Sequence, residues 1–241
     1  MIKCKNCGFE FDSNYCPECG QSSNEGRYNF KHLVKDILDV FFKFKETVFP
    51  TIHKLINAPA ETTHDFLNGK RVHLFNPLKY VFFLALINSF LILQFKLLDA
   101  YLKSHDIVSQ SITKFYTSNI SIIDMLCIPL MSFISFIFFK FKKYNYSEHV
   151  ILNCYLNGNI YIFGIILSII QLFFRQNFNL IILTNEYFNY FSILYMVIVY
   201  MYFFSEKNPV GFLRASTALL LNYIIYGFIL GYFSEYFTGK N

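Results

Sequence analysis

The chain has 241 residues, of which 54% are hydrophobic and 20% aromatic but only 15% charged. A soluble domain carries about a quarter charged residues, and here the apolar residues stand in long uninterrupted blocks, so the composition excludes an ordinary soluble domain. The net charge of +5 is spread over segments beside these blocks, where basic residues set membrane topology, and we therefore expect no nucleic-acid binding. The sequence predicts an all-α polytopic membrane protein.

The chain opens with two CxxC pairs in the stretch CKNCGFEFDSNYCPECGQ. Two residues between cysteines allow both sulfurs of a tight turn to face one ion, and four thiolates close a tetrahedral zinc site. A glycine follows each pair, at Gly8 and Gly20, where such a turn often needs a positive φ. The FEFDSNY between the pairs is long enough for two very short strands and a turn. We therefore expect a zinc ribbon at residues 1–21, with zinc bound by Cys4, Cys7, Cys16 and Cys19.

Three other interpretations of the cysteine pairs remain open. Two disulfides would suit a secreted domain, a redox CxxC would suit a larger α/β domain, and four thiolates also bind iron in rubredoxin-like sites. Zinc is favoured by the doubled spacing, and four protein ligands leave no position for a catalytic water, so its role would be structural. The aromatic residues Phe9, Phe11 and Tyr15, which we expect to be exposed, either contact a partner or pack on the ribbon itself.

The polar start of the chain shows no cleavable signal peptide, because the first long apolar run begins only near Pro77. We therefore expect a cytoplasmic N-terminus, where thiols stay reduced. Residues 22–76 read as a polar linker, an amphipathic helix and a basic juxtamembrane segment. Apolar residues from Phe30 to Leu55 recur at spacings of three and four, which predicts a helix that Pro50 breaks or kinks. We expect this helix to lie along the cytoplasmic interface of the membrane or to pack on the inner face of the bundle.

The juxtamembrane segment contains a predicted turn at Asn68-Gly69, directly before Lys70 and Arg71. Two interpretations of these cations remain open: they contact lipid phosphates, or they act as ordinary positive-inside anchors.

The remaining residues form a predicted helical bundle, 77–241. A spanning helix needs about 20 mainly apolar residues, and about five segments meet this condition. With the N-terminus inside, basic residues are more numerous on the cytoplasmic side, chiefly through the cluster KFKK, in agreement with the positive-inside rule. The predicted spans are 77–98, 120–139, 150–174, 187–204 and 215–236.

The third predicted span carries a polar face. At 100° per residue, one side of this helix collects His149, Asn153, Asn157, Ser168 and Gln171. An unpaired amide in hydrocarbon costs several kcal/mol, so this face points into the bundle or a cavity. It either joins helices by hydrogen bonds or lines a pathway.

The order of these features resembles a Bacteroidota family of multi-pass membrane proteins with an N-terminal zinc ribbon, known as domain of unknown function 3667. The family often has Arg-Pro-Gly where this chain has Ala58-Pro59-Ala60, which puts any phosphate contact by that arginine in doubt. The resemblance implies a location in the bacterial inner membrane and supplies no activity. The matching residues are Cys4, Cys7, Cys16, Cys19, Gly20, Gln21, His32, Gly69, Lys70, Arg71, Pro77, Glu148 and His149.

Three functions are compatible with these features. The favoured one is a non-enzymatic scaffold, regulator or assembly factor, whose ribbon contacts a protein partner and whose bundle contacts membrane lipids. The alternative is a small permease or channel that uses the polar face, as a homo-oligomer because five spans enclose only a thin pathway. The third is an enzyme acting on a lipid headgroup with His149, Glu148, Lys70 and Arg71.

Overall fold

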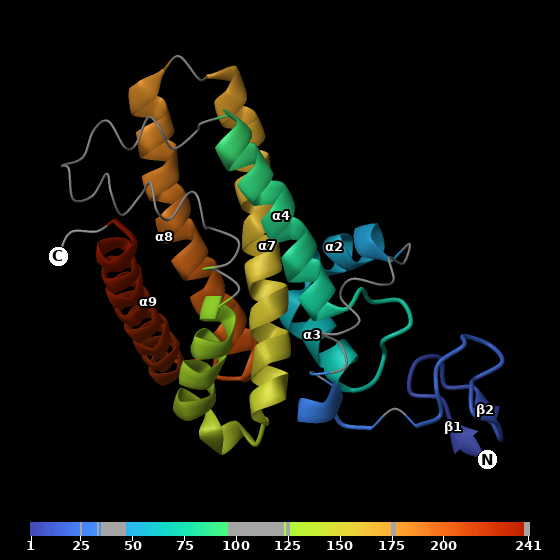
Figure 1. Ribbon diagram of the computed structural model, residues 1–241. Coiled ribbons are helices and arrows are strands. Elements are labelled where there is room, and N and C mark those ends of the chain that lie inside the picture. The colour runs from blue at the N-terminus through green and yellow to red at the C-terminus, as the bar shows by residue number, and fades with distance from the viewer. Residues whose placement is uncertain are drawn as a thin grey trace.

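The structure is a computed structural model whose described part is mostly helical, with a small two-stranded ribbon at the N-terminus (Figure 1). In Figure 1, α7 runs through the middle of the helices, α4 lies along it, and the ribbon lies apart from the long helices. The described residues are 1–24, 26–32, 34, 47–95, 123, 126–174 and 177–238.

The ribbon consists of β1 (Ile2–Lys3) and β2 (Glu10–Phe11), which pair antiparallel with Ile2 opposite Phe11. The prediction of two strands between the cysteine pairs is wrong, because the strands lie before and after the first pair. The reason is a hydrogen bond from Cys4 N to Phe9 O (2.8 Å), which closes the first CxxC turn and brings its two flanks together.

Two short helices follow the linker, α2 (Val48–Asn57) and α3 (Pro59–Leu67). Pro50 does not break α2: it lies in the first turn, where the backbone N–H has no partner within the helix. Most of the predicted amphipathic helix before Val48 lies outside the described residues. The prediction missed α3, which begins with Pro59 at its first position, a site that suits proline because its φ is already helical.

The bundle is built around α7 (Tyr146–Phe173), which starts four residues before the predicted span. Asn145 and Glu148 form a capping box, in which each side chain accepts a hydrogen bond from the backbone N–H of the other, and this fixes the start. Helix α4 (Pro77–Phe95) packs along α7. The Tyr80 ring fits against Gly158, where an added Cβ would lie 2.3 Å from ring carbons.

Helices α8 (Phe178–Phe203) and α9 (Pro209–Thr238) pack against each other. Both begin earlier than the predicted spans 187–204 and 215–236, because polar residues interrupt their apolar pattern near the start. A helix over Leu126–Phe138 matches the described part of the predicted span 120–139. The 3-10 turn η1 (Lys140–Lys142) follows it and leads towards α7.

Two helices of the described residues are long and apolar enough to cross a membrane, α7 and the segment Pro209–Ile229 of α9. The apolar helices Pro77–Ile92 and Leu126–Phe138 are shorter within the described residues. Large apolar side chains of α9 are exposed, among them Leu220, Tyr223, Ile224 and Phe228. An exposed apolar surface of this kind is typical of a lipid-facing helix. The prediction of about five spans stays a prediction.

Candidate metal centre and its contact with the bundle

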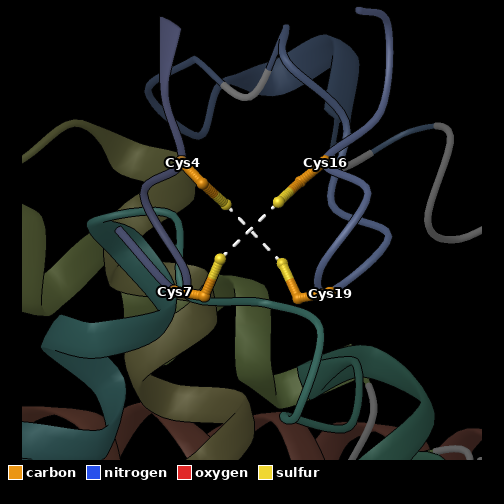
Figure 2. A group of neighbouring side chains, drawn as sticks. All are labelled: Cys4, Cys7, Cys16 and Cys19. Carbon is orange, nitrogen blue, oxygen red and sulfur yellow. Dashed lines mark hydrogen bonds between the residues drawn. The ribbon is translucent and has the colours of Figure 1, made fainter. Parts of the chain in front are cut away.

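The four cysteines of the two CxxC pairs converge on a common centre (Figure 2). All four Sγ atoms lie within 4.8 Å of one another, and the pairs Cys4–Cys19 and Cys7–Cys16 are both 3.6 Å apart. Sulfurs bound at about 2.3 Å to one tetrahedral ion lie about 3.8 Å from each other, whereas a disulfide needs about 2.05 Å. The four thiols are free, and their arrangement fits a single metal ion.

Two glycines and the backbone amides shape this site. Gly8 (φ 82°) and Gly20 (φ 72°) adopt the predicted left-handed conformation, and each donates its N–H to the carbonyl of the first cysteine of its pair (2.9 and 2.8 Å). A side chain at either position would strain the turn. The two turns are therefore built alike, and each presents two sulfurs to the centre.

The thiols of the first turn differ in acidity. Burial disfavours the Cys4 thiolate, but backbone N–H groups of Cys7 and Asn6 and the neighbouring thiols outweigh it and lower the pKa of Cys4 to about 6. The backbone contact with Phe9 favours the Cys7 thiolate, but burial and the other three sulfurs outweigh it and raise the pKa of Cys7 to about 12. One thiol thus ionises readily, and complete ionisation needs a cation to offset the accumulated charge.

The ribbon has a very small core, formed by Cys4, Phe11 and Cys16 with Cys19 packed against them. The prediction that Phe11 is exposed is wrong, because its side chain faces the cysteines and is 6% exposed. Phe9 and Tyr15 are exposed. So few buried atoms cannot offset the chain entropy of about 20 residues, so a bound ion would have to supply most of the folding free energy.

Gln21 joins the ribbon to the bundle. Its side chain is 4% exposed and donates from Nε2 to the carbonyl oxygen of Gly69 (2.6 Å), while its Oε1 accepts from the backbone N–H of Arg71 (3.4 Å). Gly69 has φ 101°, which forms the predicted turn, and a Cβ there would lie 3.0 Å from the Lys5 side chain. The ribbon therefore rests directly on the turn that follows α3.

Arg27 makes a second connection, to the start of α7. Its Nε and Nη2 each lie 2.7 Å from one oxygen of Glu148, whose side chain is 6% exposed, and Nη2 also donates to the Lys143 carbonyl (2.7 Å). Asn145 Nδ2 donates to the Tyr28 carbonyl (2.9 Å). Sequence reasoning missed this pair, because 121 positions separate its members and no local pattern links them.

Lys70 and Arg71 both have partners within the chain. Lys70 Nζ donates to Asp65 (2.7 Å), and this contact raises the pKa of Lys70. Arg71 donates to the carbonyls of Phe66 and Gly26 (3.2 Å each), and its guanidinium lies 5.3 Å from the ring centres of Tyr28 and Phe66. Contact with lipid phosphates stays a prediction for these two cations.

Most residues of the polar face of α7 bond to neighbouring helices. His149 Nδ1 lies 2.8 Å from Ser135 Oγ, on the helix Leu126–Phe138. Asn153 donates to Ser132 and Ser135 of that helix and accepts from the Tyr200 hydroxyl (2.6 Å). These contacts are typical of helix association, and a pathway along this face stays a prediction. The remaining contacts are Asn157 Nδ2 to Met131 Sδ (3.5 Å) and Gln171 Nε2 to Thr184 and Asn185 (2.9 Å each), and Ser168 is buried.

Asn159 is a buried polar residue that the prediction missed. It accepts from Tyr80 (2.8 Å), and its Nδ2 donates to the Leu55 carbonyl (2.9 Å) and to Tyr195 (2.7 Å). It thereby joins α2, α4, α7 and α8 at one point. Its position in an otherwise apolar helix was the available signal, but it lies off the face on which Asn153 and Asn157 gather.

These observations define a class: a mostly helical chain with two candidate membrane spans and an N-terminal four-cysteine site that can hold a metal ion. Residues 46–88 match the family described as "Protein of unknown function (DUF3667)". This match supports membership of that family, as the resemblance of the motifs predicted, and it covers α2, α3 and the first part of α4. No curated protein and no solved structure matches the chain.

Proposed function

We propose that this protein is a scaffold or assembly factor of the bacterial inner membrane, whose helical bundle carries a zinc-bound ribbon for contact with a protein partner in the cytoplasm. The observation that carries this proposal is the combination of a four-thiolate site, closed by its own ligands, with a fixed attachment of the ribbon to the bundle through Gln21 and Arg27. A saturated tetrahedral site supplies structure rather than a reaction centre.

Zinc suits this donor set. Four cysteine sulfurs from two CxxC turns are typical ligands of structural zinc, and a cytoplasmic ribbon would keep its thiols reduced. Bound zinc would hold the four thiolates of Cys4, Cys7, Cys16 and Cys19 together and so stabilise the ribbon. The glycine turns orient the sulfurs towards one centre, and backbone N–H groups favour the ionised form of Cys4 and Cys7.

The ribbon offers an apolar surface to a partner. Ile2, Phe9 and Tyr15 are 46%, 46% and 66% exposed. Aromatic side chains that remain exposed on a rigid module are frequent anchors of protein interfaces. Because Gln21 and Arg27 hold the ribbon against the bundle, these side chains would be presented at a fixed position relative to the membrane.

The first test is the metal content of full-length protein extracted from the membrane fraction. We expect about one zinc per chain by elemental mass spectrometry, and near zero for the variant Cys16→Ser/Cys19→Ser, which should still partition to membranes. Iron in place of zinc would correct the choice of metal. Wild-type protein without stoichiometric metal, or protein found in the soluble fraction, would overturn the proposal.

The second test concerns the partner. A photo-crosslinking amino acid at Tyr15 should give a discrete adduct in intact cells that the Cys16→Ser/Cys19→Ser variant loses, because the surface exists only on the folded ribbon. The matched control is the same crosslinker at Lys54, which is exposed on α2. An adduct that survives loss of the cysteines, or that forms equally from Lys54, argues against the ribbon as a contact module.

A further inference from the structure

Two turns at one end of the bundle bring basic side chains together. The turn of η1 and the turn between α8 and α9 meet through Glu206, which contacts Lys142 Nζ (3.4 Å) and Arg214 Nη1 (2.5 Å). The Arg214 guanidinium also lies 4.3 Å from the ring centre of Phe141. Residues far apart in the sequence therefore form one surface. We call the surface around the cations of these two turns, at 140–143 and 207–214, the basic end.

Local backbone geometry supports this arrangement. Lys143 (φ 61°) and Ser205 (φ 52°) adopt left-handed conformations that reverse the chain in each turn. Gly211 lies so close to the preceding turn that an added Cβ would be 2.1 Å from the Glu206 carbonyl oxygen. Only glycine fits there. Two turns held in such constrained conformations form a fixed surface.

The basic end has more positive than negative charge. Glu206 is shared by two of its cations, and Glu148, which lies near Lys143, is already paired with Arg27. Lys207 Nζ lies 4.0 Å from the ring centre of Tyr202, and no ion pair involves it within the described part of the chain. Lys140 and Lys143 are exposed and likewise have no acidic partner there. The five cations of the basic end are Lys140, Lys142, Lys143, Lys207 and Arg214.

Arg214 is oriented for a further ligand. Glu206 occupies Nη1, and Nε and Nη2 donate to no described residue. Nε and Nη2 form the planar pair of donors that binds a phosphate through two parallel hydrogen bonds. The contact with Phe141 holds the guanidinium plane in place, so less side-chain entropy is lost when a ligand binds.

The basic end borders an apolar surface. Four large apolar side chains here are more than half exposed: Phe141 of η1, Tyr202 in the last turn of α8, and Val210 and Leu213 in the first turns of α9. Cations beside exposed aliphatic and aromatic side chains are characteristic of the headgroup region of a bilayer, where lysine and arginine reach phosphates and aromatic rings lie among the headgroups.

We propose that the basic end is a binding site for phosphate groups, in which Arg214 supplies paired donors and Lys140, Lys143 and Lys207 supply the surrounding charge. Its ligand chemistry is the phosphate of an anionic phospholipid headgroup, or a free phosphate ion of the cytoplasm. The proposal goes beyond the scaffold function and uses neither the zinc nor the ribbon.

The test compares lipid retention by full-length variants of equal charge. Protein is reconstituted in mixed phosphatidylglycerol–phosphatidylcholine vesicles and re-extracted in mild detergent, and the retained lipids are measured by native mass spectrometry. The variant Lys140→Gln/Lys143→Gln/Lys207→Gln removes three cations of the basic end. The matched control Lys3→Gln/Lys31→Gln/Lys54→Gln removes three exposed cations elsewhere. A second arm measures the shift in thermal unfolding produced by inorganic phosphate alone.

We expect wild type and control to retain phosphatidylglycerol preferentially, and the basic-end variant to lose this preference about tenfold or more, because it lacks three cations that attract an anionic surface. Arg214→Lys should weaken retention although it keeps the charge, because lysine cannot offer paired donors. A thermal shift with inorganic phosphate that the basic-end variant loses would assign the free ion instead. Equal loss in both triple variants, or no preference in wild type, would overturn the site, whereas the metal and membrane-partition results above would be unaffected.

Discussion

The ribbon and the bundle are stabilised by different means. In the ribbon, a few buried side chains surround four sulfurs that repel one another once ionised. In the bundle, a large apolar core is crossed by hydrogen bonds between buried amides and hydroxyls, such as those of Asn159 and Asn153. We therefore expect the fold of the ribbon to depend on a bound ion, and that of the bundle to depend on its own side chains. Removing the ion should leave the bundle folded, and removing a buried hydrogen bond of the bundle should leave the ribbon folded.

The largest effect is expected from the variant Cys4→Ser/Cys7→Ser. Structural zinc in small cysteine sites contributes about 10–16 kcal/mol of apparent binding free energy, so the ribbon should unfold completely while α7 stays protected. Amide hydrogen exchange of residues 2–22 and of α7 in detergent measures both regions at once. Cys127→Ser is the control that should keep the metal. A ribbon that remains protected without metal would contradict its dependence on the ion.

The second effect concerns the bundle alone. Asn159→Leu leaves the Tyr80 hydroxyl, the Leu55 carbonyl and the Tyr195 hydroxyl without their amide partner, so we expect a loss of about 2–3 kcal/mol in the free energy of unfolding. Denaturant unfolding in detergent micelles, followed by circular dichroism, measures it. Asn179→Leu, at an exposed position of α8, should change it by less than about 0.5 kcal/mol. Equal effects of the two changes would mean that the hydrogen bonds of Asn159 contribute little.

The third prediction concerns the ion pair between Arg27 and Glu148, which connects the ribbon to the bundle. Arg27→Gln leaves the buried Glu148 carboxylate without its cation, but Arg27 is 60% exposed, and solvent screening reduces the expected cost to about 1–2 kcal/mol. The double variant Arg27→Gln/Glu148→Gln should recover part of this loss, because no unpaired charge then remains. A double-mutant cycle on the same unfolding assay measures the coupling. Strictly additive losses would show that the pair contributes nothing.

The smallest effect is a pH dependence due to His64 on α3. Burial lowers the pKa of His64 below its ordinary value of 6.5, although its contact with the Phe203 carbonyl and the charge of Asp65 act in the opposite direction. The unfolded chain therefore binds the proton more tightly, and stability should fall as the pH drops below about 6.5. His64→Gln should flatten this dependence, and the exposed His53→Gln should not. Unfolding midpoints at pH 7.5 and pH 5 provide the comparison.

Features with a local cause could be predicted from the sequence. The cysteine site, the glycines after each cysteine pair and the Asn68-Gly69 turn each depend on a few neighbouring residues. The long apolar runs indicated the central parts of the helices α4, α7, α8 and α9. Helix starts were less accurate, because caps such as Asn145 and polar first turns carry no apolar pattern. Helix α3 was missed because its threonines, proline and acids resemble a loop. The contacts of Gln21 and Arg27 join distant segments, and no spacing in the sequence indicates them.

The attachment through Gln21 has a consequence for how the two regions can change. Both ends of its amide contact main-chain atoms of the turn at 69–71, so the recognition depends on the path of the backbone and hardly on which side chains the turn carries. Substitutions on the outer surface of either region would leave this joint intact, provided that position 21 keeps an amide and position 69 keeps its left-handed conformation. The ribbon surface could thus be redesigned for a new binding partner without any compensating change in the helices.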